Sequence, residues 1–186
     1  MNLLRTVFLA ALCLLPLAAS AQSYTPVTKV YLRLNGIIGD SQDQGHVGDI
    51  EIMNASFGVS QAGLALSGGG AGATRSQFTP ITIQKAADKT SPLLFVNCAL
   101  GKSITSAKIS FRNIGGPQAP YDYLTIDLGT VFISSFNIDC TNGDALVNET
   151  VGIAYGAMKI TFQPLNGAPI SQNFSVVKNK SLPDVP

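Results

Sequence analysis

The sequence predicts a mainly β fold, an antiparallel β-barrel or sandwich of two sheets with one short flanking α-helix. Apolar and polar residues alternate with period two along most of the chain, which is typical of strands that bury one face. Gly, Pro, Asn and Asp separate these runs. One segment alone has helix signals at both ends, and no strand–helix–strand repeat is present, which argues against a parallel sheet.

From the alternating runs we expect seven to nine strands. In the first run, Val30, Leu32 and Leu34 fall on one face. In the longest run the alternation slips by one residue at Gly129, which we interpret as a β-bulge. Asn142-Gly143 predicts a hairpin turn, because this pair accepts positive φ. The runs span residues 29–36, 49–60, 80–85, 107–113, 123–138, 151–162 and 173–178.

The predicted helix runs from about Pro92 to Leu100. Ser91 is the expected N-cap, Pro92 occupies the first helical position and Gly101 ends the helix. In this register Leu93, Val96 and Leu100 share one face.

Residues 1–21 form a predicted secretory signal peptide. A basic start that ends at Arg5 precedes the apolar run 6–18, and small residues stand at Ala19 and Ala21. The apolar run is shorter than the roughly 20 residues that span a bilayer, and the mature part has no other long apolar stretch. We therefore expect export to the periplasm or the outside, and a single mature domain over residues 22–186.

The charge of the mature chain is close to zero. The full sequence has 12 Lys and Arg and 11 Asp and Glu, and Arg5 leaves with the signal peptide. No basic run remains, which argues against nucleic-acid binding, since that depends on clustered Lys and Arg.

Two cysteines, Cys98 and Cys140, remain after cleavage. One interpretation is a disulfide, which an oxidising compartment would preserve and which would be worth roughly 4 kcal/mol in the chain-entropy model. The other is two thiols that act as small hydrophobic side chains. The sequence leaves both open.

Two motifs suggest chemistry, and neither has the context that the chemistry requires. Gly68, Gly70 and Ala73 have the spacing of a dinucleotide loop, but a strand signal follows where a helix is needed. His46 is the only histidine, and no GxSxG-type nucleophile motif accompanies it. We interpret His46 as structural, and we expect the nearby loop carboxylates, Asp40, Asp43 and Asp49, to be solvated or to act as caps. The sequence thus predicts no catalytic residue, cofactor or metal ligand.

The stretch from Val30 to Gly167 resembles the haemolysin-coregulated protein (Hcp) family, the tube subunits of bacterial type VI secretion systems. The resemblance rests on the order and spacing of several short motifs. These are Gly39-Asp40-Ser41, His46, Asp49-Ile50-Glu51-Ile52, Phe57-Gly58-Val59-Ser60-Gln61, the glycine-rich loop 67–78, the helix segment and the tyrosine-led strand near residue 121.

The resemblance implies a compact barrel of two sheets with a flanking helix and no catalysis. Family members form rings of six copies that can stack into a tube, which is expelled with its cargo. The expected partners are therefore further copies of this chain, type VI components and effector cargo. The glycine-rich loop would reach toward neighbouring subunits, through Ser67, Gly68, Gly69, Gly70, Ala71, Gly72 and Arg75.

Two features depart from the family pattern. Family members normally lack a cleavable signal peptide, and their tryptophan before the Phe-Gly position is missing here. A monomeric extracellular β-module that binds a glycan or a protein is therefore the alternative function. The mass of the native protein separates the two, because a ring would have about six times the mass of one mature chain.

Overall fold

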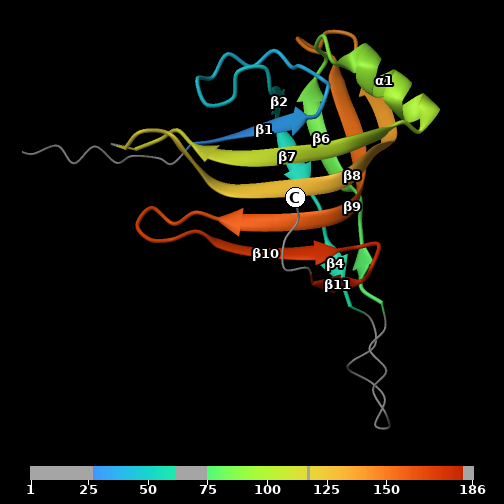
Figure 1. The fold of residues 1–186 in the computed structure, drawn as a ribbon. Coiled ribbons are helices and arrows are strands. Elements are labelled where there is room, and N and C mark those ends of the chain that lie inside the picture. Colours follow the sequence, from blue (N-terminus) through green and yellow to red (C-terminus); the bar gives the residue numbers. More distant parts are fainter. Residues whose placement is uncertain (1–26, 62–74, 117, 182–186) are drawn as a thin grey trace, which may run out of the picture.

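The computed structural model describes residues 27–61, 75–116 and 118–181. The strands wrap into a barrel, and one helix lies across its upper end (Figure 1). The predicted signal peptide and the predicted loop residues Ser67–Gly72 lie outside the described residues. The elements are β1 (Thr28–Leu34), β2 (Ile50–Ile52), β3 (Asn54–Ser56), β4 (Val59–Ser60), β5 (Gln77–Phe78), β6 (Ile81–Ala86), α1 (Ser91–Leu100), β7 (Ser103–Asn113), β8 (Tyr121–Asp139), β9 (Asn148–Phe162), β10 (Ile170–Ser175) and β11 (Lys180–Ser181).

The mainly β prediction is confirmed, and every strand pair is antiparallel. The expected number of strands is wrong: the described residues form eleven, because the structure adds two-residue strands such as β4, β5 and β11. Such short pieces leave no alternation to detect in a sequence.

The barrel closes through an interrupted strand. The main sheet runs β11-β10-β9-β8-β7-β1-β2, and β6 pairs with both β3 and β9. β2 and β3 are separated by Met53 alone, whose N–H donates to the carbonyl of Gln84 on β6 at 2.7 Å. A closed ring of strands leaves no open edge around the barrel itself.

The interior is filled by the inward faces that the alternation predicted. Ile81, Ile83, Ile109 and Ile153 are fully buried. β-branched side chains suit such positions, because they pack well on a pleated surface. The same core includes Leu32, Leu34, Ile50, Leu94, Ile126, Leu128, Val131, Ile133 and Val151.

The slip in alternation near Gly129 is a corner of the barrel, and the predicted bulge there is wrong. Leu128 and Val131 both face the core, yet the register of β8 with β7 and with β9 is unchanged between them. Buried residues are spaced in the same way on β7, at Ile104 and Ala107. In β7 and β8 the set of residues that points into the core therefore shifts by one residue at paired positions of the two strands. Figure 1 shows β8 and β9 turning upward there.

Local backbone features permit this corner. Thr130 has a φ of 51°, which is rare outside glycine. A Cβ on Gly156 would come within 3.3 Å of both Thr130 and Val177, so the strands can approach closely only without one. The register shifts that do occur in β8 lie elsewhere, opposite Phe111/Arg112 on β7 and between Ile133 and Ser135.

The hairpin predicted at Asn142-Gly143 is confirmed. β8 and β9 pair up to Asp139 and Asn148, and the connection between them turns at Gly143, which has a φ of 104°. The turn is closed by Asp144, whose N–H donates to the carbonyl of Thr141 at 2.9 Å.

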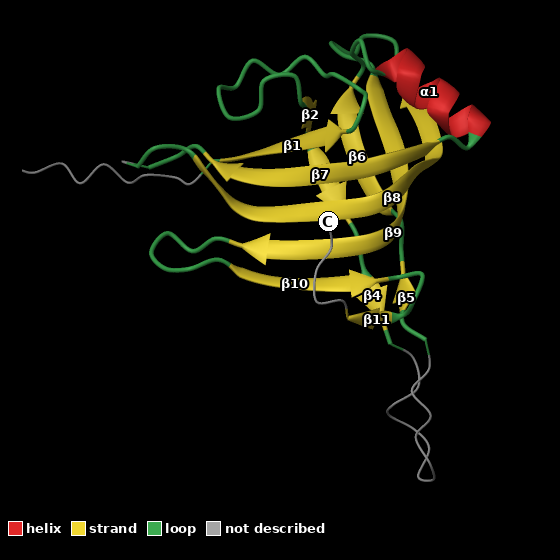
Figure 2. Ribbon diagram, viewed as in Figure 1, coloured by secondary structure: helices red, strands yellow, loops and turns green. Residues whose placement is uncertain are grey.

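The helix lies where the sequence predicted it, but its cap and its buried face differ. The cap position is Thr90, one residue earlier than the expected Ser91, because Asp88 accepts from the N–H of Thr90 and fixes the preceding turn. Its buried residue is Leu94. Leu93, Val96 and Leu100 do share a face, and that face is exposed. Figure 2 shows the helix lying along the outside of the strands.

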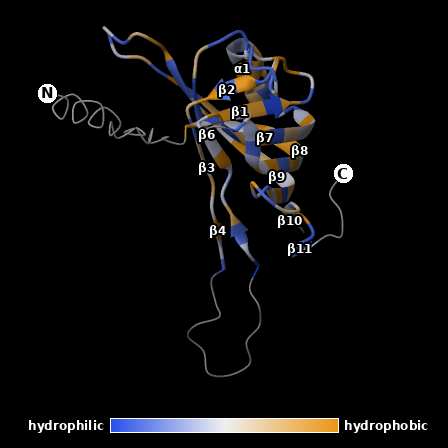
Figure 3. Cartoon of the chain, turned by 90° about the vertical axis from the view of Figure 1, so that its left-hand side faces the viewer, coloured by the Kyte–Doolittle hydropathy of each residue, from blue (hydrophilic) through white to orange (hydrophobic). Residues whose placement is uncertain are grey.

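β4 and β5 form a separate two-stranded ribbon. Its base is held to the barrel by Phe78, whose ring stacks on Phe174 at 5.3 Å between centroids and meets Tyr155 edge-on at 6.4 Å. In Figure 3 the ribbon continues from β3 away from the body of the barrel. It therefore carries the predicted inter-subunit loop on an anchored stem.

Candidate functional site

The connection between β1 and β2 folds back on itself and encloses His46. The N–H of Gly39 donates to the carbonyl of Gly48 at 2.7 Å, and the N–H of Ser41 donates to the carbonyl of Asp49 at 3.0 Å. A Cβ on Gly39 would overlap the carbonyl oxygen of Asp49. Glycine is therefore required at the point where the two arms of this loop meet.

His46 lies between two carboxylates in the interior. Its side chain is 3% exposed, and its ring stacks on Tyr31 with centroids 4.2 Å apart. Nδ1 is 2.8 Å from Oδ2 of Asp49, and Nε2 is 3.0 Å from Oδ1 of Asp122. Ionised carboxylates only accept, so both hydrogen bonds form together when each ring nitrogen carries a proton.

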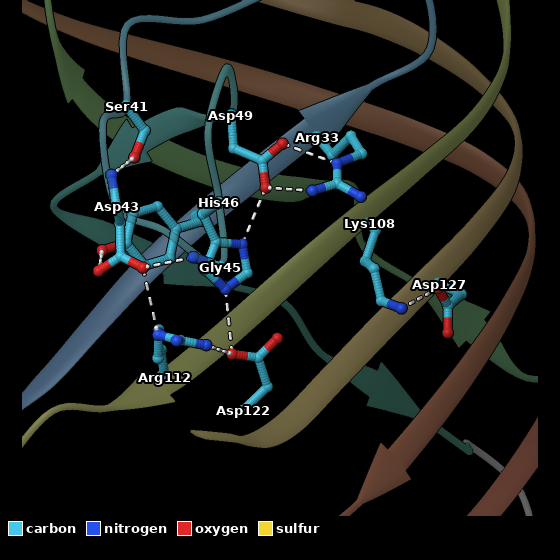
Figure 4. A network of polar contacts seen from close by, with 11 residues as sticks. Arg33, Ser41, Asp43, Gly45, His46, Asp49, Lys108, Arg112, Asp122 and Asp127 are labelled. Atoms are coloured by element: carbon cyan, nitrogen blue, oxygen red, sulfur yellow. Dashed lines mark hydrogen bonds and ion pairs between the residues drawn. The ribbon is translucent and has the colours of Figure 1, made fainter. Parts of the chain in front are cut away.

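Two arginines hold the carboxylates on either side of the ring (Figure 4). Arg33 donates to both oxygens of Asp49, from Nε at 2.7 Å and from Nη2 at 3.1 Å. Arg112 donates from Nη1 to Oδ1 of Asp122 at 3.0 Å. Buried charges are tolerated when they are paired and hydrogen-bonded in this way. We call Arg33, Asp49, His46, Asp122 and Arg112 the His46 network.

The network shifts the pKa values of the carboxyls and the phenol that border it. Burial alone would raise the pKa of Asp122, but hydrogen bonds from His46 and Arg112 outweigh it, so the pKa lies below its ordinary value. The pKa of Asp43 is lowered in the same sense, through hydrogen bonds from the N–H of Gly45 and from Tyr31. Burial and the contact with Asp43 raise the pKa of the Tyr31 hydroxyl.

This arrangement is suited to holding strands together. Both nitrogens of His46 are occupied by carboxylates, so the ring has no free nitrogen to accept a proton from a substrate. The hydroxyl of Ser41 in this loop accepts from the N–H of Asp43 and is buried, and the hydroxyl of Tyr31 donates to Asp43. The network joins the β1–β2 connection to the outer ends of β7 and β8. The structure supports the interpretation of His46 as structural.

One expectation about the loop carboxylates is wrong. Asp40 is exposed and pairs with Lys89 at 2.8 Å, as a solvated loop residue would. Asp49, in contrast, is buried in the His46 network. It differs from Asp40 because the ring of His46 and the guanidinium of Arg33 both contact its carboxylate.

A second buried charge cluster lies where α1 meets the barrel. Lys85 on β6 has no exposed surface, and its Nζ donates to Glu149 at 2.8 Å and to Asp88 at 2.9 Å. Asp88 in turn accepts from the N–H of Thr90 at the start of α1. The other oxygen of Glu149 is buried and has no hydrogen-bond partner among the residues that the structure describes. This cluster fixes the helix to β6 and β9.

Most members of these two clusters give no signal in the sequence. Lys85 gave one available signal, because it falls on the same face as Ile81 and Ile83 in an alternating strand. A lysine on an inward face requires an acidic partner. Arg112 and Asp122 gave no comparable signal in the sequence. They come together near His46 only because β7 pairs with β8 in the folded protein.

Arg75 is the residue of the predicted inter-subunit loop that the structure describes. It is exposed, and its Nη2 donates to the carbonyl of Val176 at 2.9 Å. The arginine therefore lies against the connection between β10 and β11. The other predicted loop residues remain a prediction.

Both predicted disulfide partners are free thiols in the structure. Cys98 is half-buried on α1, and Cys140 is exposed just after β8. The bridge therefore stays a prediction for the oxidised, exported protein, and thiol counting on denatured, unreduced material tests it.

A groove with a volume of about 560 Å³ lies between the β1–β2 connection and strands β7 and β8. Arg33, Lys108 and Asp127 line it beside apolar residues such as Ile38 and Val47. Within residues 27–61, 75–116 and 118–181, no cluster of His, Cys, Asp and Glu could hold a metal ion. No helix in that part of the chain is long and apolar enough to cross a membrane.

Comparison with known proteins agrees with this fold. A family model described as "Type VI secretion system effector, Hcp" matches residues 31–162. Protein hcp1 of Pseudomonas aeruginosa is 28% identical over 156 residues, which cover 81% of this chain and 96% of that protein.

Solved structures share the architecture. One described as "Structure of a type six secretion system protein" has a TM-score of 0.77 at 20% identity, and the match covers 84% of this chain and 100% of that one. Hcp1 from Salmonella typhimurium has a TM-score of 0.71 at 24% identity, with 83% and 99% covered. The family match includes most of this sequence and all of β2 to β9. The chain belongs to the Hcp family of structural type VI secretion proteins.

Proposed function

We propose that this chain is a non-catalytic ring subunit, of which six copies assemble and can stack into a tube. The observation that carries the proposal is the extent of the family match. Residues 31–162 include β2 to β9 and most of β1, which together form the closed barrel. The part of the chain that matches the family is therefore the barrel, which is the part from which a ring would be assembled.

The buried polar groups support a structural role. The His46 network and the Lys85 cluster each use their charges to join elements of the same chain. Removing one partner of such a pair leaves an uncompensated buried charge, so these residues favour a single rigid arrangement of the barrel. Rigid subunits suit an assembly whose interfaces repeat.

The proposed partners are further copies of this chain, with type VI components or effector cargo as additional ones. The proposed location is the periplasm or the outside, reached through the predicted signal peptide. Export in this way differs from the cytoplasmic assembly that the family resemblance implies. The mature N-terminus tests this point, because cleavage after Ala21 leaves Gln22 as the first residue.

Native mass spectrometry of the processed protein tests the ring. We expect a species of about six times the mature mass, and ring-shaped particles by negative-stain electron microscopy. A monomer at all concentrations tested would contradict the proposal. That result would favour the alternative function, an extracellular β-module that binds a glycan or a protein.

A further inference from the structure

The end of the barrel at β10 and β11 carries unpaired positive charge. Lys178 and Lys180 are exposed, and Arg75 is held beside them by its hydrogen bond to Val176. Among the residues the structure describes, none of these three cations has an ion-pair partner. The sequence has no acidic residue between 150 and 183. Val177, which is 71% exposed, adds an apolar side chain. We call Arg75, Val177, Lys178 and Lys180 the basic turn.

The connection between β8 and β9 carries the opposite charge. Asp139 and Asp144 are exposed, and the carboxylate of Asp144 accepts from the N–H of Thr141 at 2.8 Å. Neither aspartate has an ion pair with a described residue. Ile138 and Leu146, on either side, are both exposed large apolar side chains. We call Ile138, Asp139, Asp144 and Leu146 the acidic hairpin.

Cations near the acidic hairpin are already used. The sequence has no Lys or Arg between residues 113 and 158. The Ala87 N–H donates to the Val147 carbonyl, which brings the β6–α1 connection close. Two lysines near that connection are already paired: Lys85 is buried against Glu149 and Asp88, and Lys89 pairs with Asp40. The aspartates of the acidic hairpin are therefore available to form ion pairs with another molecule.

The two surfaces lie at opposite ends of the barrel. In Figure 1 the β8–β9 connection is at the top beside α1, whereas β11 is at the bottom. Figure 3, turned by 90°, keeps α1 above and β11 below. Opposite placement prevents the two surfaces from neutralising each other within one copy. It allows them to meet between copies that follow one another in the same orientation.

We propose that the acidic hairpin of one copy docks on the basic turn of the next copy. The inference rests on the proposed assembly and assigns one of its contacts to named residues. Each surface combines exposed apolar side chains with charges of one sign, and protein interfaces commonly contain both apolar and polar groups. Opposite charges would fix the orientation and the register of the contact. Because the two surfaces differ, the contact is heterologous, so it can close a ring or extend a stack.

Charge reversal with rescue tests this contact. One variant is Asp139→Lys with Asp144→Asn, since asparagine keeps an oxygen that accepts from Thr141. The second is Lys178→Glu with Lys180→Glu. The control is Lys29→Glu, at an exposed position on β1 away from both surfaces. Each protein is measured alone, and the two charge variants are also mixed at equal concentration.

We expect each charge variant alone to shift the native mass distribution toward smaller species, while the control matches the unchanged protein. The equimolar mixture should recover the larger species, because each variant then meets the opposite charge on the other. Assembly of the unchanged protein should weaken as salt rises, since exposed charges are screened. Rescue by mixing cannot be explained by a fold defect.

Two results would overturn the inference, and they are distinguishable. Rings that persist in every variant, with no effect of mixing, remove this contact and leave the proposed ring intact. In that case the basic turn would be expected to bind an anionic partner other than this chain. An unchanged protein that is monomeric throughout contradicts both the contact and the proposed function.

Discussion

His46 is the residue whose environment most constrains its replacement. It is buried between Asp49 and Asp122, and each of these carboxylates also meets an arginine. A side chain with a single donor group leaves one carboxylate without its hydrogen bond. The cost of breaking such a buried pair exceeds that of any change on the exposed part of the same loop.

We therefore expect His46→Gln to lower the free energy of unfolding by about 3 kcal/mol. Gln44→Ala is the matched control, because Gln44 is exposed on the same loop, and it should change stability by less than about 0.5 kcal/mol. Urea unfolding followed by circular dichroism measures both. Equal stabilities for the two variants would refute the structural role. Loss of assembly at unchanged stability would give His46 a direct role in the contact between copies.

Asp122 makes the free energy of unfolding depend on pH in the acidic range. Its folded pKa is lowered, so its contribution is fully present above the unfolded value of about 3.9 and is lost as the pH falls through the folded value. Asp122→Asn lacks this contribution at every pH. We expect the difference in Tm between the unchanged protein and this variant to shrink between pH 6 and pH 2. A difference that stays constant over this range would contradict the assignment.

The interpretation of His46 as structural came from the sequence, because no nucleophile motif accompanies it. Its burial between two carboxylates is consistent with that interpretation, but its partner on β8 could not be found in the same way. Asp49 lies in the same loop, whereas Asp122 on β8 and the Arg112 that meets it on β7 are more than 60 residues away, and only the pairing of strands brings them to His46. Lys85 differs, because its place in an alternating strand already indicated burial.

At the scale of elements, α1 is attached to the barrel by a small part of its surface. Leu94 is fully buried, whereas the neighbouring Leu93 is 49% exposed. The helix sequence is apolar on nearly every side, so its spacing could not show which face is buried. The sequence therefore predicted the bounds of the helix well and gave no signal for Leu94.

The pair Leu93 and Leu94 gives a matched test of this attachment. Leu94→Ala should lower the free energy of unfolding by about 2–5 kcal/mol, because it opens a cavity between α1 and the barrel. Leu93→Ala makes the same chemical change on the exposed side, with an expected cost below about 1 kcal/mol. Chemical unfolding of both variants measures the difference. Similar losses would mean that the other face of the helix packs on the barrel.

The strands show where the alternation of apolar and polar residues stops being informative. Local sequence signals located the long strands, through this alternation, and the hairpin after β8, through its Asn-Gly pair. It misread the corner near Gly129, because a bulge in one strand and a shared turn of three strands produce the same slip. The difference lies in the neighbouring strands, which a single run cannot reveal.

At the scale of the whole molecule, the β4–β5 ribbon stands on an anchored base. Val59 pairs with Phe78, and Phe78 packs on Phe174. A change beyond this stem should therefore leave the barrel intact. The predicted inter-subunit loop, Ser67–Gly72, lies beyond it in the sequence.

Deleting Gly68 to Gly72 should weaken assembly and spare the fold. We expect the β-sheet circular dichroism to be retained and the native mass distribution to shift toward smaller species. Replacing the same five residues by serine keeps the length and serves as the control. Loss of the β-sheet signal in the shortened protein would show that the loop is needed for folding itself.

The position of β9 in the chain also sets the order in which the protein can fold. β9 begins at Asn148, and it pairs with β6, β8 and β10. The barrel cannot close until this late strand has been synthesised, and contacts between distant residues form slowly. For a chain that crosses a membrane before it folds, as proposed here, this delay is useful. The first 147 residues lack the strand that closes the barrel, which favours threading through a translocation pore before the native fold is complete.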